Sequence, residues 1–277
     1  HKEYRRQRQM CIRDRFYTPK QILEMTIAVG GYNSMNRWTD GLNIPAEENG
    51  NFFKKEGGED LSRFDTPTSA KYAEAKSVVA PLAKANGAPL DRPKRDSVED
   101  IKKAIQAAAS RQPTLPLAGS APDTWKATAN PAWVKLLATF TKSGKARYDG
   151  VMACQNKGNL SPRLRAAIAW VAAREDRALY ALDAAAKRLK ELGLSEDEIY
   201  DLDGAATALE PGDRKALALV KKLSISPAVV ADSDVESLRS AMGGPFSDKQ
   251  VAEIVHHVCN ASFFNRLTEA ANLPAGQ

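Results

Sequence analysis

The 277-residue sequence has few of the residues on which redox, metal and membrane functions depend. It contains three cysteines and three histidines, and no two cysteines form a C-x-x-C pair. Such scattered thiols do not make a disulfide framework and fit a reducing compartment. No apolar run reaches the roughly 18 residues of a membrane span, and no apolar segment follows the basic N-terminus as in a signal peptide. We therefore expect a cytoplasmic protein that does not span a membrane.

Motifs for cofactors, metals and nucleophilic catalysis are also missing. The sequence has no Gly-rich phosphate loop, no dinucleotide fingerprint and no evident Ser-His-Asp set. His256 and His257 are adjacent, so on a helix they point about 100° apart and cannot grip one metal ion. The sequence also holds no His-x-x-x-His pair. We therefore expect neither a cofactor nor a bound metal.

The net charge of +6 does not indicate a nucleic-acid-binding surface. Residues 1–15 hold six Lys or Arg against two acidic residues, so most of the excess lies there. In the rest of the chain, charges of both signs are interspersed, which is typical of an ordinary solvated surface. Residues 1–15 also lack any helical or strand period. We interpret this segment as a non-native tail and leave it out of the fold prediction.

The periodic pattern that is present is helical. Asn130 and Pro131 begin a segment whose apolar residues fall on one helical face, and Ser161 and Pro162 begin another. A third helical segment ends at Gly193, as the C-terminal ends of helices often do. No segment alternates polar and apolar residues with period two, and no hairpin dipeptide separates β-branched runs. The sequence therefore predicts an all-α fold.

An internal repeat relates two distant segments of the chain. Residues 17–45 match residues 246–274 without gaps, at a constant offset of 229. Each copy opens with a capping box, which begins at Thr18 in the first copy and at Ser247 in the second. The identical pairs are Lys20 with Lys249, Gln21 with Gln250, Glu24 with Glu253, Val29 with Val258, Asn36 with Asn265, Arg37 with Arg266, Thr39 with Thr268, Asn43 with Asn272, and Pro45 with Pro274.

The repeat predicts how the chain is divided. Residues 16–45 are interpreted as the closing helix of a first repeat whose front is missing. Residues 46–124, rich in Gly, Pro, Lys and Glu in their first part, are expected to be a linker with one or two helices. Residues 125–277 are expected to form one complete domain.

The segment LSPRLRAAIAWVAAREDRALYALDAAAKRLKELGLSEDEI, residues 160–199, resembles the core signature of the carboxymuconolactone decarboxylase and alkylhydroperoxidase D family. In that family L-S-x-R-L-R-E is followed by C-x-x-C-x-x-x-H, by G-L-S-x-E-E-I, and by a closing helix that begins F-S-x-x-E. Here LSPRLR, GLSEDEI and FSDKQ keep this frame. The resemblance covers residues 130–277 and, as a partial first repeat, residues 17–45. It implies an alkylhydroperoxidase D-like helical bundle, a homo-oligomer, and a peroxidase (antioxidant) or decarboxylase activity.

The family's catalytic residues are absent from this repeat. Peroxidase members use two cysteines, a histidine and a glutamate, and these positions correspond here to Ala178, Ala181, Ala185 and Ala166. An alanine side chain can neither attack a peroxide nor transfer a proton. We therefore expect this repeat to be inactive as a dithiol peroxidase and to act as a structural or oligomeric domain.

Two other hypotheses stay open at this point. Arg177, Tyr180 and Asp183 flank the alanines and could serve a cysteine-independent enzyme of the lactone decarboxylase type, with a small-molecule ligand. His257 and Cys259 in the closing helix could approach the same pocket, as could Cys154 just upstream of the opening helix. Alternatively, the active site lies in the missing front of the first repeat, and the visible repeat is its structural partner. The sequence does not identify a substrate or a reductant.

Overall fold

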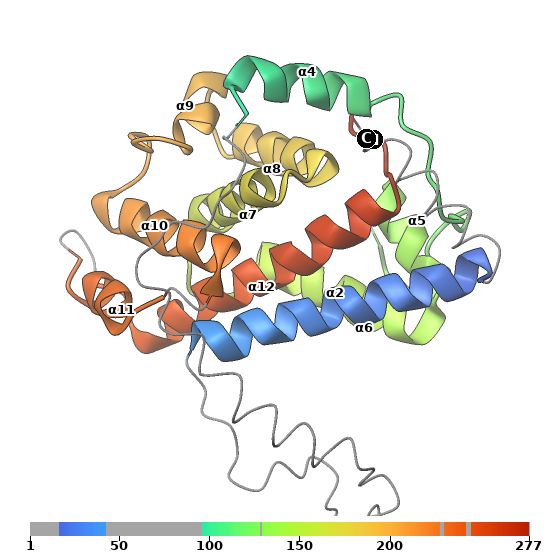
Figure 1. Ribbon diagram of the computed structural model, residues 1–277, viewed down its shortest axis with the longest axis horizontal. Coiled ribbons are helices and arrows are strands. Elements are labelled where there is room, and N and C mark those ends of the chain that lie inside the picture. The colour runs from blue at the N-terminus through green and yellow to red at the C-terminus, as the bar shows by residue number, and fades with distance from the viewer. Residues whose placement is uncertain (1–16, 43–95, 128, 228–229, 242–244, 277) are drawn as a thin grey trace, which may run out of the picture. The chain divides into compact units, whose positions relative to one another are not determined.

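Every regular element is helical in the computed structural model, which describes residues 17–42, 96–127, 129–227, 230–241 and 245–276 (Figure 1). The predicted all-α class is confirmed for these residues. None of their helices is long and apolar enough to cross a bilayer. The tail at residues 1–15 and most of the predicted linker lie outside the described residues. The elements are α2 (Pro19–Gly41), α4 (Val98–Ala108), the 3-10 turn η2 (Asp123–Trp125), α5 (Ala132–Ala138), α6 (Thr141–Asn156), α7 (Pro162–Asp176), α8 (Leu179–Glu191), α9 (Glu196–Asp201), α10 (Pro211–Ile225), α11 (Asp232–Arg239) and α12 (Asp248–Ala270).

The two helices of the sequence repeat, α2 and α12, begin and end at equivalent positions. Each is 23 residues long, and both pairs of boundaries differ by the offset of 229. The predicted capping boxes are confirmed: the Thr18 and Ser247 hydroxyls each accept a hydrogen bond from the backbone amide three residues on, and the glutamine there accepts one from the cap amide. These contacts satisfy amides that the first turn of a helix leaves without partners.

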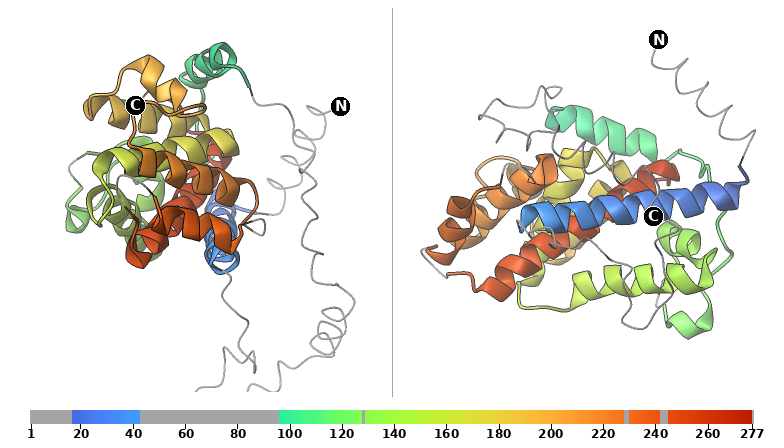
Figure 2. Two further views of the ribbon diagram at one scale, coloured as in Figure 1. Left: turned by 90° about the vertical axis from the view of Figure 1, so that its left-hand side faces the viewer. Right: turned by 60° about the horizontal axis from the view of Figure 1, so that its bottom comes forward.

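α12 is the central helix of the bundle, with α2 beside it on one side and α7 on the other (Figures 1 and 2). Trp170 of α7 and Phe263 of α12 are among the largest fully buried side chains. Gly30 lets α2 approach closely, because a Cβ at this position would lie 3.1 Å from the Phe263 ring. α8 and α10 pack on α7, and α5 packs on α6, so the apolar core extends to both ends of α12.

Asp176, the last residue of α7, connects the two repeat helices. Its carboxylate accepts a hydrogen bond from the Asn265 amide at 3.0 Å and lies 3.6 Å from the Arg266 guanidinium, both on α12. The guanidinium of Arg37 on α2 lies 3.9 Å from the same carboxylate. Arg37 also donates to the backbone carbonyls of Leu223 and Ser224 near the end of α10. α2 is therefore fixed to the bundle by a buried cation as well as by apolar contacts.

Two glycines of α6 test how closely this helix is packed. A Cβ on Gly144 would lie 2.0 Å from the Leu137 carbonyl oxygen, whereas a Cβ on Gly150 would meet nothing within 4 Å. We expect Gly144→Ala to lower the free energy of unfolding by about 1–3 kcal/mol through overpacking. Gly150→Ala should raise it by up to about 1 kcal/mol, because alanine favours the helix. Urea denaturation measures both, and changes of the same sign would contradict the close contact at Gly144.

Candidate functional site

The four alanines singled out in the sequence lie together around α7 and α8. Ala178 is the N-cap of α8, and Ala181 and Ala185 follow it along that helix at the i+3 and i+7 positions. Ala166 lies on α7, which packs against α8. All four are buried. Their methyl groups therefore share one region of the fold, as the sequence predicted.

Three of these alanines, Ala166, Ala181 and Ala185, line a cavity of about 510 Å³, which we call the alanine-lined cavity. Its walls come from α6, α7, α8 and α12, with a contribution from Trp133 of α5. Most of the lining is apolar, but the walls also carry polar and charged side chains. These belong to Cys154, Gln155, Asn156, Arg165, Lys187, Arg188, Glu191, His257, Asn260 and Asn265.

Glu253 of α12 supports the polar side of this cavity. Its carboxylate accepts hydrogen bonds from the backbone amides of Asn159 at 2.7 Å and Leu160 at 3.2 Å, just before α7 begins. Burial alone would raise the pKa of Glu253, but these hydrogen bonds outweigh it and hold the pKa below the usual value. The His257 Nε2 atom lies 3.5 Å from the same carboxylate. Glu253 thus connects the cavity histidine to the loop that precedes α7.

His257 is uncharged at neutral pH. Burial lowers its pKa to about 4, and this effect exceeds the opposing attraction of Glu253. In the contact between these two residues, the neutral imidazole therefore donates a hydrogen bond to the Glu253 carboxylate and does not form an ion pair with it. A neutral imidazole can accept a proton, but with a pKa of about 4 it is too weak a base to deprotonate the Cys154 thiol in the same cavity, whose pKa is about 11.

The two described thiols are poorly suited to peroxide chemistry. Burial raises the pKa of Cys154 to about 11 and that of Cys259 to about 12. At pH 7 a thiol with a pKa of 11 is ionised in about one molecule in ten thousand, and the thiolate is the reactive form. Both cysteines are free, and they line different cavities. The two thiols lie close enough for Cys154 to contribute to the raised pKa of Cys259, but they are not joined in a disulfide.

Arg165 is a cation of the alanine-lined cavity that forms no salt bridge with a described carboxylate. Its guanidinium donates one hydrogen bond to the Lys157 carbonyl at 2.8 Å, while its buried Nε atom has no partner among the described residues. The other two cations of the lining have carboxylate partners, since Lys187 pairs with Asp183 and Arg188 pairs with Glu191. Arg165 was not predicted from the sequence as a site residue, although it belongs to the LSPRLR segment.

Arg177, Tyr180 and Asp183 do not converge on the alanine-lined cavity. Arg177 ends α7 with a φ of 54° and pairs with Asp96 at 3.2 Å. Tyr180 is buried beside Phe264, and burial raises its pKa to about 12. Asp183 accepts from the Gly276 amide at 2.9 Å. None of the three lines the alanine-lined cavity.

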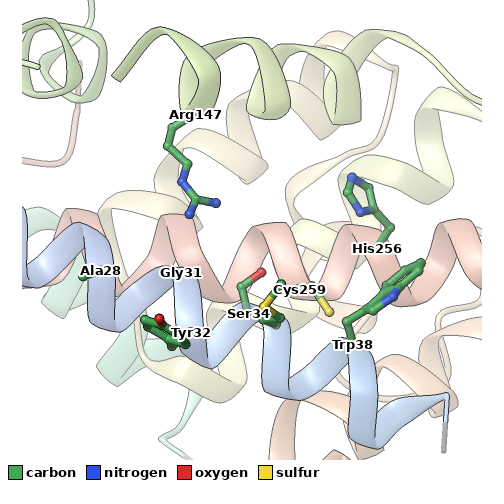
Figure 3. A pocket seen from close by; sticks show the side chains of 9 residues that line it. Ala28, Gly31, Tyr32, Ser34, Trp38, Arg147, His256 and Cys259 are labelled. Atoms are coloured by element: carbon green, nitrogen blue, oxygen red, sulfur yellow. The ribbon is translucent and has the colours of Figure 1, made fainter. Parts of the chain in front are cut away.

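A second cavity of about 510 Å³ lies beside α2 (Figure 3). α2 contributes Ala28, Gly31 and Tyr32, among others, and α12 contributes His256 and Cys259. The Arg147 side chain of α6 reaches toward α2 from the opposite side and stacks over the Phe263 ring at 4.7 Å. His257 and Cys259 were both named as possible pocket residues, and the structure places them in different cavities. The described residues hold no cluster of three or more His, Cys, Asp or Glu side chains that could bind a metal.

Comparisons with known proteins give similarities of fold at low sequence identity. No family model and no curated protein matches the sequence. An uncharacterized peroxidase-related protein from Silicibacter sp. TM1040 is 20% identical, with 68% of this chain and 91% of that chain covered and a TM-score of 0.49. A cysteine-to-alanine variant of the debrominase Bmp8, in complex with 2,3,4-tribromopyrrole, is 17% identical over 52% of this chain and 76% of that chain, with a TM-score of 0.47. Bmp8 without ligand is 14% identical over 64% and 84%, also with a TM-score of 0.47.

Proposed function

We propose that the described unit is a catalytically silent domain of the alkylhydroperoxidase D-like type, with a structural or oligomeric role. The observation that carries this proposal is the alanine-lined cavity, where Ala166, Ala181 and Ala185 present methyl groups at the positions of the expected acid, thiol and imidazole. Cys154, the thiol that does reach this cavity, is held protonated by burial. The described walls of the cavity hold no pair of groups for reducing a peroxide through a dithiol.

The structure gives no support to the lactone decarboxylase alternative through the residues proposed for it. An acid and a base that act on one ring have to converge on one small molecule. Arg177, Tyr180 and Asp183 instead contact Asp96, the aromatic cluster and the Gly276 amide. A structural role needs no such convergence and is the simpler account of these contacts.

The purified chain is expected to consume no organic hydroperoxide above the buffer rate when dithiothreitol is supplied as reductant. The physical reason is the small thiolate fraction of Cys154 and Cys259. A peroxide-consumption assay of the chain and of the Cys154→Ser and Cys259→Ser variants should give three indistinguishable rates. Saturable turnover in the parent chain that disappears in Cys154→Ser would overturn the proposal.

The double variant Ala178→Cys, Ala181→Cys serves as the matched control. Its two sulfurs would lie one turn apart at the start of α8, where C-x-x-C pairs form disulfides and where the helix N-terminus lowers thiol pKa values. We expect a mild oxidant to remove both new thiols in a thiol titration and to leave Cys154 and Cys259 reduced. This result would show that the start of α8 keeps the backbone geometry of a dithiol site.

A further inference from the structure

One face of α2 is apolar and exposed. Among the described residues, the exposed large hydrophobic side chains all lie on α2 or directly before it, and their exposed fractions run from 40% to 70%. Met25, Val29 and Tyr32 follow a spacing of four and three residues, which places them in one stripe along the helix. The members of this α2 face are Tyr17, Met25, Val29, Tyr32 and Met35. A continuous apolar stripe of this kind marks an interaction surface more often than chance exposure does.

The equivalent face of α12 is buried. At the offset of 229, Met25 corresponds to Ile254, which is 0% exposed, and Val29 corresponds to Val258, which is 1% exposed. Tyr32 corresponds to the buried Ala261. α7, α8 and α10 all pack on α12. On α12, the side chains at these positions contact a helical hairpin. The equivalent side chains of the α2 face are exposed, because none of the described helices covers them.

Polar groups on α12 fix both ends of α7, and α2 has the same groups. Glu253 accepts from the backbone amides just before α7, and Asn265 donates to Asp176 at the end of α7. Their equivalents on α2 are the identical residues Glu24 and Asn36, and both are exposed. A carboxylate and an amide at this separation suit a helix that has free amides at its start and a carboxylate at its end.

The two cavities repeat the same register. Ala28, Gly31, Tyr32 and Met35 line the cavity beside α2 (Figure 3). Their equivalents at the offset of 229 are His257, Asn260, Ala261 and Phe264, and all four line the alanine-lined cavity. The cavity beside α2 therefore has the wall that α12 supplies to the other cavity, without the wall that α7 and α8 supply there.

We infer that the α2 face accepts a second helical hairpin of the α7–α8 type that enters it from the N-terminal side of α2. The order of elements supports this direction of entry, because the hairpin that covers α12 precedes α12 in the chain. The occupant presents free backbone amides to Glu24, a carboxylate to Asn36 and an apolar face to the stripe. This inference stands apart from the proposed function, since it does not depend on whether the alanine-lined cavity is inactive.

The test extends the chain with a second copy of its own segment α5 to α11, which contains the α7–α8 hairpin. Residues 130–245 are placed directly before Tyr17, in place of residues 1–16, so that they enter α2 in the register in which they enter α12. Oxidation of individual methionines by hydrogen peroxide is followed by peptide mass spectrometry. Met25 and Met35 should oxidise readily in the parent chain and about tenfold more slowly in the extended chain, because docking covers both thioethers. The half-buried Met152 of the parent sequence serves as the internal reference.

Variants of the extended chain separate specific docking from loose association. Glu24→Gln should restore part of the oxidation of Met25, whereas Lys20→Gln, which alters an exposed residue of the same helix, should not. Continued rapid oxidation of Met25 and Met35 in the extended chain would overturn the inference. So would protection of both methionines in the parent chain, because residues 43–95 or a second copy would then already cover the face. If both methionines are protected in the parent chain, sedimentation of the parent chain and of its Tyr32→Asp variant shows whether a second copy covers the face.

Discussion

Replacing Asp203 by alanine is expected to lower the free energy of unfolding by about 3–5 kcal/mol, the usual cost of breaking a buried ion pair from one side. The Arg174 Nε atom lies 2.6 Å from the Asp203 carboxylate, and the Arg174 side chain is 2% exposed. Another nitrogen of the same guanidinium donates to the Asp96 carbonyl. Without Asp203, a full positive charge stays inside the bundle at the end of α7 with too few acceptors.

Urea denaturation followed by circular dichroism measures this loss. Glu196→Ala is the matched control, because Glu196 forms a comparable pair with Lys102 at 2.8 Å in which both side chains are solvent-exposed. Water and salt screen that pair, so its removal should leave the midpoint unchanged. Asp203→Asn should fall between the two, since the amide keeps an acceptor for Arg174 but no charge. Equal midpoints for the Asp203→Ala and Glu196→Ala variants would refute the buried pair.

The stability of the protein is expected to fall by about 3 kcal/mol between pH 6.5 and pH 4 because of His257 alone. Burial lowers the pKa of this histidine to about 4 in the folded protein, against an ordinary value of 6.5. Within this window the unfolded chain binds a proton at His257 and the folded chain does not. Acid therefore favours the unfolded chain, and the stabilising contribution is complete above pH 6.5 and lost as the pH approaches 4.

The variant His257→Gln isolates this effect. Its free energy of unfolding should depend less on pH between 6.5 and 4 than that of the parent chain, and the two profiles should run parallel above pH 7. A parent profile that is flat across this window would show that His257 is accessible to protons in the folded state.

Features set by short stretches of sequence were predictable. The capping boxes at Thr18 and Ser247 involve residues three apart, so the sequence alone locates the starts of α2 and α12. The alanine positions were also predictable, because Ala181 and Ala185 lie on one helix at a spacing that aligns their side chains.

Features that depend on how helices rotate and pack were not predictable. His257 and Cys259 are two residues apart, which is about 200° around a helix, so a single pocket could not hold both. Their proximity in the sequence suggested otherwise. Arg165 belongs to α7 and Glu253 to α12. Only the packing of these helices brings Arg165 to the alanine-lined cavity and Glu253 to the loop that precedes α7. The one sequence signal for Glu253 was its identity with Glu24 in the repeat.

The attachment of α2 has a consequence for synthesis of the protein. Arg37 donates to the carbonyls of Leu223 and Ser224, which are 186 and 187 residues further along the chain. Translation makes α2 first among the described helices, but these acceptors are made only after a long further stretch of chain. During that interval the inner side of α2 has neither α10 nor α12 to cover it. Until α10 and α12 are made, a nascent chain thus carries an uncovered apolar helix, the state that holding chaperones bind.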